Sequence, residues 1–332
     1  MDRSVICIWV TDGALSLNNI KPIFRFLKSK AEAGQKTVLV TLTAVTGAST
    51  RNPGAHMAVA EDGSFSGSFS GGCVEAAVVS EALDVITSGQ PRELRFGAGS
   101  PYLDIRLPCG GSIDLLFTPV IDDRKIIDIF DRIRDREPLT IMLDSESTTI
   151  RCEAQRSVKT AVERAGSQIL IHHLPAARII IAGHGPSVES LVRISLSYGI
   201  ESAVLSPDPL VVAQVCSLAQ TAHRLKTPDA TPLLDPDPWT ACIFYFHDHD
   251  WEARLMKQAL SSSAFYVGAM GSRKTHAMRL QYLEDIDVPA EERARIVAPI
   301  GLIPSTRDPA TLALSTLAEV VERYHQNFGY RT

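Results

Sequence analysis

The chain has 332 residues, 45% hydrophobic and 21% charged, and its 33 basic residues against 38 acidic ones give a net charge of −5. This length exceeds what one hydrophobic core usually supports, so we expect two domains, and the composition argues against a disordered chain. The absence of a basic run argues against nucleic acid as a partner, and no apolar run approaches the ~20 residues that span a bilayer. We therefore expect a cytoplasmic protein.

The first half of the chain mixes short strands with helices. A helix is expected over residues 19–33, and a β-branched strand follows over residues 36–45. Residues 55–60 and 64–70 are expected to pair as a hairpin around a turn at Gly63. The remaining expected elements are a helix over 74–88, strands over 92–97, 103–108 and 112–120, a helix over 122–136, and strands over 138–143 and 167–174. This pattern predicts a mixed α/β domain over residues 1–174.

The second half of the chain shows strands that alternate with helices. Strand–turn–helix units cover residues 177–199 and 263–276, and further strands are expected over 201–208 and 240–250. Strands and helices at this spacing are typical of a doubly wound parallel sheet. The sequence therefore predicts a Rossmann-like domain over residues 175–332.

A glycine-rich turn follows the first strand of this second half. Gly183, His184, Gly185 and Pro186 form the turn, and the two glycines occupy the first two positions of a dinucleotide-binding fingerprint. Such glycines let a pyrophosphate approach the N-terminus of the next helix. The turn predicts phosphate binding, and the alternative is a turn that serves only packing.

The other parts of that fingerprint differ from the usual pattern. Val188 replaces the third glycine, and the second strand ends in Ser206 with Asp208 two residues later. An acid at the end of that strand normally binds the ribose of NAD. The sequence therefore favours phosphate binding over ordinary NAD binding.

Two further polar segments are candidate sites in this half. His247 and His249 flank Asp248, and in an extended strand both histidines would lie on one side. They are candidates for a metal site or a proton donor, and the alternative is hydrogen-bonded polar residues at a strand end. Gly271, Ser272 and Arg273 begin a predicted helix and suit an anion, or else Ser272 is only a helix cap.

Six cysteines are scattered along the chain without a CxxC pair, which argues against a disulfide framework or a structural zinc site. Two of them stand beside paired glycines. Cys73 precedes a predicted helix, whose dipole favours a thiolate, and Cys109 precedes a strand. The candidate cofactor contacts in these two segments are Gly71, Gly72, Cys73, Glu75, Cys109, Gly110 and Gly111. The alternative for an arbitrary cysteine is a packing role.

With these motifs in order, the chain resembles the xanthine dehydrogenase accessory protein family, XdhC/CoxI. The N-terminal motifs are "PGAHMAVAEDGSFSGSFSGGCVEAAV" and "PCGGSIDLLFTP". The C-terminal motifs are "IIIAGHGP", "HDHD", "FYVGAMGSRKTH" and "APIGL". Because they follow the family order and cover both halves, they are more specific than any single motif.

The resemblance implies a chaperone for the molybdenum cofactor. Such proteins bind molybdopterin, support its sulfuration and insert it into a xanthine dehydrogenase-type hydroxylase. It further implies a cysteine desulfurase as partner and a homodimer, with molybdopterin or a dinucleotide form as cargo. Cys73 and Cys109 carry over as thiols that contact the cofactor, Cys73 through molybdenum, and the turn of residues 183–186 carries over as a nucleotide or phosphate site.

Three hypotheses follow from the sequence. The first is a cofactor chaperone in which Cys73, helped by Cys109, contacts the cofactor in a cleft between the domains. The second is an NAD(P)-dependent oxidoreductase that uses the Rossmann-like domain, with His247 or His249 as proton donor. The third is a metal-dependent hydrolase built on the "HDHD" segment.

Overall fold

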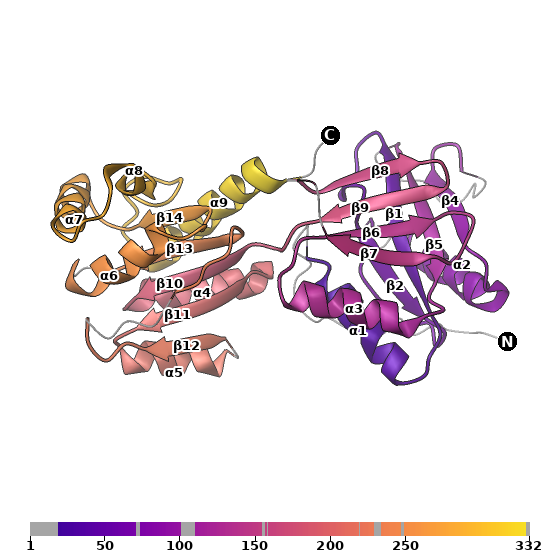
Figure 1. The fold of residues 1–332 in the computed structure, drawn as a ribbon, viewed down its shortest axis with the longest axis horizontal. Helices are drawn as coiled ribbons and strands as arrows, with labels where there is room; N and C mark the ends of the chain where they lie inside the picture. The colour runs from indigo at the N-terminus through magenta and orange to yellow at the C-terminus, as the bar shows by residue number, and fades with distance from the viewer. Residues whose placement is uncertain are drawn as a thin grey trace. The chain divides into compact units, whose positions relative to one another are not determined.

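The computed structural model describes residues 19–70, 74–100, 110–154, 157, 159–218, 220–228, 234–246 and 249–329. These residues divide into two compact units, shown in Figure 1. One unit extends to Pro175 and includes the residues from Phe328 onward, and the other comprises Ala176–Asn327. Each unit has its own hydrophobic core.

The N-terminal unit contains three helices and nine strands among its described residues. They are α1 (Lys21–Glu32), β1 (Thr37–Thr46), β2 (His56–Ala60), β3 (Phe65–Ser66), α2 (Glu75–Ser88), β4 (Arg92–Gly97), β5 (Ser112–Pro119), α3 (Asp123–Arg134), β6 (Leu139–Asp144), β7 (Ile150–Ala154), β8 (Ala161–Ala165) and β9 (Gln168–His173).

Two antiparallel sheets form the framework of this unit. The first has the order β3-β2-β1-β5-β4 and the second the order β7-β6-β9-β8. Side chains alternate along central β1, so that Val38 and Val40 join the core under α2, whereas Leu39 joins a second core with α1, α3 and the second sheet. Because both faces of β1 are covered, the β-branched pattern of its sequence reflects burial on both sides.

The structure confirms the helix expected over residues 74–88 as α2, which ends at left-handed Gly89. The hairpin is also confirmed, since Val59 pairs with Phe65 across the turn. The length of its return strand was wrong, because β3 ends at Ser66 instead of continuing to residue 70. The backbone after β3 turns away to hydrogen-bond Glu75. The strand expected over 103–108 lies outside the described residues.

The C-terminal unit contains six strands and six helices among its described residues. They are β10 (Arg178–Gly183), α4 (Pro186–Tyr198), β11 (Glu201–Ser206), α5 (Pro209–Ser217), β12 (Thr221–Arg224), β13 (Thr240–Tyr245), α6 (His249–Leu260), β14 (Tyr266–Ala269), α7 (Arg273–Asp285), α8 (Ala290–Arg293), β15 (Ile296–Val297) and α9 (Pro309–Phe328).

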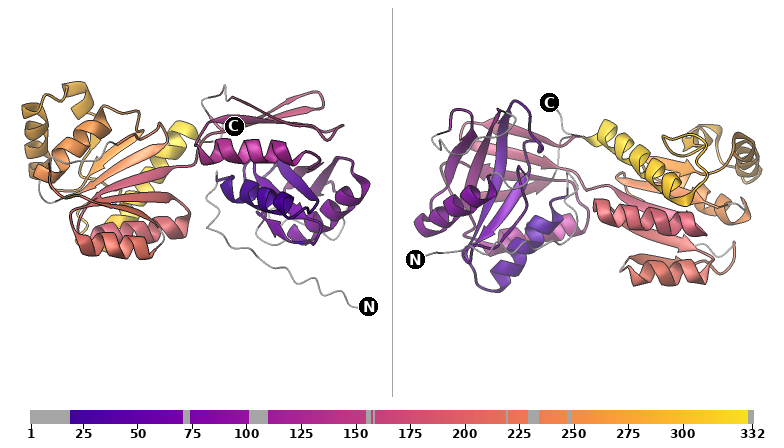
Figure 2. Two further views of the ribbon diagram at one scale, coloured as in Figure 1. Left: turned by 60° about the horizontal axis from the view of Figure 1, so that its bottom comes forward. Right: turned by 180° about the vertical axis from the view of Figure 1, so that it is seen from behind.

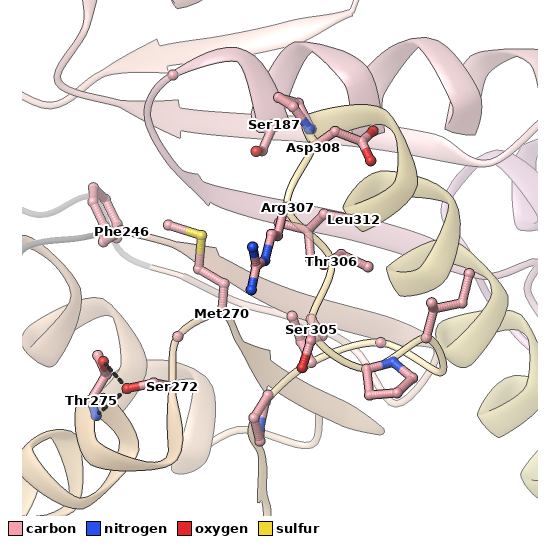
Figure 3. A pocket seen from close by; sticks show the side chains of 18 of the residues that line it. Ser187, Phe246, Met270, Ser272, Thr275, Ser305, Thr306, Arg307, Asp308 and Leu312 are labelled. Carbon is pink, nitrogen blue, oxygen red and sulfur yellow. Dashed lines mark hydrogen bonds between the residues drawn. The ribbon is translucent and has the colours of Figure 1, made fainter.

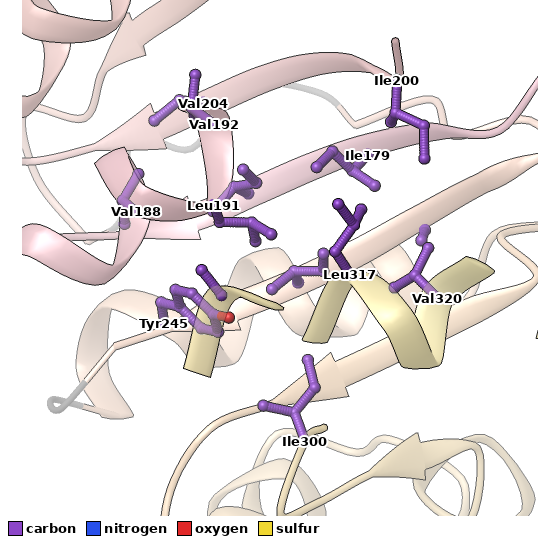
Figure 4. Packing of buried hydrophobic residues seen from close by; sticks show 14 of the residues in the cluster. Ile179, Val188, Leu191, Val192, Ile200, Val204, Tyr245, Ile300, Leu317 and Val320 are labelled. Atoms are coloured by element: carbon purple, nitrogen blue, oxygen red, sulfur yellow. The ribbon is translucent and has the colours of Figure 1, made fainter. Parts of the chain in front are cut away.

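The six strands form one parallel sheet in the order β12-β11-β10-β13-β14-β15, which is the strand order of a Rossmann fold. Helices α4, α5 and α9 cover one face, as Figure 2 shows, and Leu191 and Leu317 pack there against Ile179 (Figure 4). Leu255 of α6 and Leu283 of α7 belong to the core on the other face. This arrangement confirms the predicted fold class. No described helix is long and apolar enough to cross a membrane.

Two buried histidines connect the sheets of the N-terminal unit. His56 of β2 and His173 of β9 place their Nε2 atoms 2.9 Å apart, and the Nδ1 atom of His56 is 2.8 Å from the hydroxyl of Thr41. Burial lowers the pKa of His56 to about 3, and burial together with the neighbouring His56 and His172 lowers the pKa of His173. Both rings are therefore neutral in the folded protein near neutral pH.

These histidines predict a loss of stability in mild acid. Below the ordinary pKa of 6.5 the unfolded chain takes up protons at both rings, whereas the folded chain takes them up only near the lowered values. From pH 7.5 to pH 5.5 the two histidines together should lower the free energy of unfolding of this unit by about 3 kcal/mol. Urea unfolding of the intact chain, followed by circular dichroism at both pH values, measures this loss.

The double variant His56→Leu/His173→Leu should lose most of this pH dependence. Exposed His223 provides the control, because its replacement by Asn should leave the dependence intact. Equal acid losses in the parent and the double variant would contradict the assignment.

Candidate functional site

Glu75 organises the loop that leads to the first candidate thiol. Its side chain is 4% exposed, and Oε1 accepts hydrogen bonds from the Ser68 hydroxyl (2.7 Å) and from the N–H groups of Phe69 (3.0 Å) and Ser70 (2.9 Å). Oε2 accepts from the N–H of Val74 at 3.2 Å. Burial opposes ionisation, but these hydrogen bonds lower the pKa of Glu75 to about 2. The carboxylate stays charged and fixes the loop on both sides of residues 71–73.

The β1–β2 connection also hydrogen-bonds to the loop that Glu75 holds. The Thr50 hydroxyl donates to the carbonyl of Phe69 at 3.0 Å, and Nε of Arg51 donates to the carbonyl of Ser68 at 3.2 Å. The loop therefore has its N–H groups bound by Glu75 and two of its carbonyls bound by the β1–β2 connection.

The β1–β2 connection also contacts the segment that follows the second candidate thiol, Cys109, in the sequence. A side chain at Gly111 would overlap with the carbonyl of Thr46, and a Cβ at Gly47 would lie 3.2 Å from Cα of Gly111. Only glycine permits two backbones to approach so closely. Residues 46–51 thus contact both the segment that ends at residue 70 and the segment that begins at residue 110.

The structure describes part of the thiol region predicted from the sequence. Gly71, Gly72, Cys73 and Cys109 lie outside the described residues, whereas Glu75, Gly110 and Gly111 lie within them. Glu75 accepts hydrogen bonds from the backbone of Phe69 and Ser70 before the undescribed residues and of Val74 after them.

A second candidate site is a cavity of about 1050 Å³ in the C-terminal unit, hereafter the C-terminal crevice (Figure 3). It lies beyond the carboxyl ends of β10, β13 and β14, where ligands bind in open α/β sheets. The structure brings together here six residues predicted from two separate segments of the sequence: His184, Gly185, Pro186, Gly271, Ser272 and Arg273.

The remaining glycine of the first turn serves packing. Gly183 ends β10 opposite Tyr245, and a Cβ there would lie 2.7 Å from the Cβ of Tyr245. Gly185, by contrast, has a positive φ of 81°, and no atom lies within 4 Å of the position its Cβ would take. Gly183 therefore brings strands close together, and Gly185 opens the start of α4 to the crevice.

Ser272 is a helix cap at the start of α7. Its hydroxyl accepts a hydrogen bond from the N–H of Thr275 at 3.1 Å and lies 2.9 Å from the Thr275 hydroxyl. The helix-cap alternative considered from the sequence thus describes Ser272, while Arg273 next to it is exposed at the crevice.

Sequence reasoning missed the loop that closes the crevice, residues 299–309. Glu319 of α9 holds this loop, because its Oε2 accepts the N–H of Gly301 at 2.6 Å and the hydroxyl of Tyr266 at 2.8 Å. The Ser315 hydroxyl accepts the N–H of Ile303 at 2.7 Å. The only sequence signal was the "APIGL" motif, which contains Gly301.

The "HDHD" segment differs from its predicted geometry. Strand β13 ends at Tyr245 and α6 begins at His249, so His249 is not on a strand and does not alternate with His247 along one. His247 and Asp248 lie outside the described residues. Among the described residues, no group of three or more His, Cys, Asp or Glu side chains could hold a metal ion.

Replacing Glu75 tests its hold on the loop. Glu75→Gln should lower the free energy of unfolding by about 2 kcal/mol, because an amide N–H₂ would face N–H donors that the carboxylate now accepts. The variant should also lose less stability in acid than the parent. In the parent, the stabilisation by the charged carboxylate is complete above pH 4.5 and is lost as the pH falls toward the lowered pKa of about 2. Urea unfolding at pH 7 and pH 3.5 measures both effects.

Glu81 offers the matched control on the same helix. It forms an ion pair with exposed Arg92 at 2.8 Å, and replacing it by Gln should cost no more than about 1 kcal/mol. Equal losses for the two variants would contradict a special role for Glu75.

Comparisons with known proteins cover both halves of the chain. The model of the XdhC and CoxI family matches residues 31–97, and that of the XdhC Rossmann domain matches residues 179–320. A solved structure described as a xanthine dehydrogenase from Bacillus halodurans superposes with a TM-score of 0.72 at 20% identity, over 92% of this chain and 96% of the other. At that identity the likeness concerns the fold.

Curated relatives also match along most of their length. The molybdenum cofactor insertion chaperone PaoD of Escherichia coli K12 is 34% identical over 316 residues, which cover 95% of this chain and 92% of the relative. A protein of Bacillus subtilis 168 described as a probable xanthine dehydrogenase subunit is 22% identical over 89% of this chain and 96% of the relative. The chain therefore belongs to the XdhC and CoxI family.

Proposed function

We propose that this protein is a chaperone that binds the molybdenum cofactor and inserts it into a molybdenum hydroxylase. The observation that carries the proposal is the 34% identity to the Escherichia coli insertion chaperone along 95% of this chain. A match of this extent spans both units, so it supports a shared role for the whole chain and not for one domain alone.

The geometry around Glu75 supports a cargo site at the two cysteines. The chain that ends at residue 70 and the chain that begins at residue 110 both contact the β1–β2 connection, through Phe69 and Gly111 respectively. Cys73 and Cys109 are three residues and one residue away from these described ends. In the proposal, the Glu75 carboxylate holds the loop and Cys73, with Cys109, contacts the cargo.

Thiols suit this cargo because thiolate is a soft ligand for a metal centre with sulfur ligands. A carrier must also release what it holds, and one or two exchangeable thiols permit faster release than a closed cage of ligands. The residues described around the loop are hydrogen-bonded to one another, which supports a proposal in which they hold the loop and the cysteines contact the cargo.

The finer parts of the proposal concern partners and cargo. We infer a xanthine dehydrogenase-type hydroxylase as client, a cysteine desulfurase as the source of sulfur for the bound cofactor, and a homodimer as the working form. Molybdopterin and its dinucleotide forms are both candidate cargoes. The family assignment and the similarity to the insertion chaperone support this interpretation.

The thiol contact is tested by cofactor retention. After anaerobic loading with molybdenum cofactor and gel filtration, Cys73→Ser should retain about tenfold less cofactor than the parent, which corresponds to ~1.4 kcal/mol, and Cys109→Ser should show a smaller loss. Exposed Cys216 on α5 gives the control, since Cys216→Ser should retain as much as the parent. Parental retention by both test variants would refute the thiol assignment.

Delivery is tested with a cofactor-free hydroxylase. Adding the loaded protein should restore hydroxylase activity faster than the same amount of free cofactor, and the loaded Cys216→Ser variant should perform like the parent. If free cofactor restores activity at the same rate, the chaperone role is wrong even where binding is intact.

A further inference from the structure

We propose that the C-terminal crevice binds a phosphate or diphosphate ester that carries a flat ring, with Arg307 as its main anion contact. This inference goes beyond the thiol-based chaperone role and does not depend on it. The crevice has a volume of about 1050 Å³, at the upper end of the range in which proteins bind organic ligands and nucleotides. All its lining residues belong to the C-terminal unit.

The cationic wall of the crevice has two arginines without partners among the described residues. Arg273 and Arg307 are exposed at the cavity, and neither forms a hydrogen bond or ion pair with another described residue. Asp308 is the one acidic side chain among the described lining residues, and its Oδ1 accepts the N–H of Thr311 at 2.8 Å as a cap of α9. Among the described residues Asp308 forms no ion pair with Arg307, whose guanidinium extends toward Met270 in Figure 3.

Backbone groups at the same wall add to this charge. The open turn at Gly185 starts α4, and Arg273 is the first residue of α7, so both helices begin at the crevice. Two guanidinium groups and two helix starts around one cavity favour an oxyanion, because arginine binds phosphate through paired N–H donors.

Part of the lining of the crevice is apolar. Phe246, Met270 and Ile300 form it, and Leu302 and Ile303 extend it with exposed fractions of 51% and 45%. The hydrogen bonds of Glu319 and Ser315 to the loop, described above, hold this part in place. A flat ring can pack against such side chains, whereas inorganic phosphate alone would leave Leu302 and Ile303 exposed to water.

The structure argues against NAD(P) as the ligand. Its adenosine would need an acid after β11, but Ser206 is fully buried and Oδ1 of Asp208 accepts the N–H of Leu210 at 2.8 Å as the cap of α5. Neither residue lines the crevice. The cavity lies beside β13 and β14, on the other half of the sheet, so the ligand's ring is expected there.

The proposal is tested by isothermal titration of the full-length protein with inorganic pyrophosphate, ADP, CDP, GDP and NADH. At least one nucleoside diphosphate should bind more tightly than pyrophosphate, and NADH should bind no more tightly than ADP. Arg307→Gln should weaken the best nucleotide about tenfold and reduce its dependence on salt. Circular dichroism should show an unchanged melting temperature, because Arg307 lies on an exposed loop.

Arg224 gives the matched control, because it is exposed at the carboxyl end of β12 in the same sheet but does not line the crevice. Arg224→Gln should bind the nucleotide within about twofold of the parent. The proposal is overturned if no probe binds at millimolar concentration, if both arginine variants bind equally, or if NADH binds about tenfold more tightly than every nucleoside diphosphate.

The phosphate ester could belong to the cofactor cargo or to a free nucleotide. Measuring retention of a dinucleotide form of the cofactor distinguishes the two. If Arg307→Gln weakens both the nucleotide and the retained cofactor, the crevice holds part of the cargo. If the variant weakens only the nucleotide, a free nucleotide is the ligand. Either result supports the phosphate site, and loss of retention in Cys73→Ser alone would leave this inference unaffected.

Discussion

A buried glutamate that accepts backbone N–H groups shapes each of the two candidate sites. Glu75 binds the N–H groups of Phe69, Ser70 and Val74, and Glu319 binds the N–H of Gly301. A loop that lacks regular secondary structure leaves its N–H groups without ladder partners, and burying such groups is costly. In both units one carboxylate supplies acceptors for N–H groups that have no strand or helix partner, so the described parts of these loops are held in place.

The charge of the Glu75 carboxylate strengthens its hydrogen bonds to the loop. Hydrogen bonds to a charged group are stronger than those between neutral groups, and the lowered pKa of Glu75 keeps its charge at any pH the cell experiences. Around Glu319, burial and the adjacent carboxylate raise the pKa of Tyr266, so the phenol remains a donor. The Glu75 loop is therefore held by a charge that stays constant over this pH range, and the Tyr266 phenol remains a hydrogen-bond donor to Glu319.

Sequence patterns predicted the elements of this protein better than the contacts between them. The period of 3.6 residues located α2, and the alternation of strands and helices after residue 174 predicted the parallel sheet, because burial on repeated faces leaves a periodic signal. The return strand after Phe65 was predicted too long, since alternation alone cannot reveal that Glu75 competes for the N–H groups of residues 69 and 70.

For the candidate sites too, the sequence predicted local turns but not the long-range contacts that complete the site. The turns at Gly185 and Gly271 were predicted because glycines between a strand and a helix are typical of phosphate-binding turns, and the fold brings the two turns to one cavity. Arg307 left no signal, since it stands in a loop without periodicity that Glu319 fixes from α9.

The contact between His56 and His173 has a consequence for the direction of hydrogen bonding across the N-terminal unit. Two neutral imidazoles whose Nε2 atoms face each other must adopt opposite tautomers, because one nitrogen donates and the other accepts. The tautomer of His56 in turn decides whether the Thr41 hydroxyl donates to Nδ1 or accepts from it. The tautomer of His56 thus sets the direction of both hydrogen bonds in a chain that runs from β1 through β2 to β9. To reverse that direction, both rings must change tautomer and the Thr41 hydroxyl must reorient.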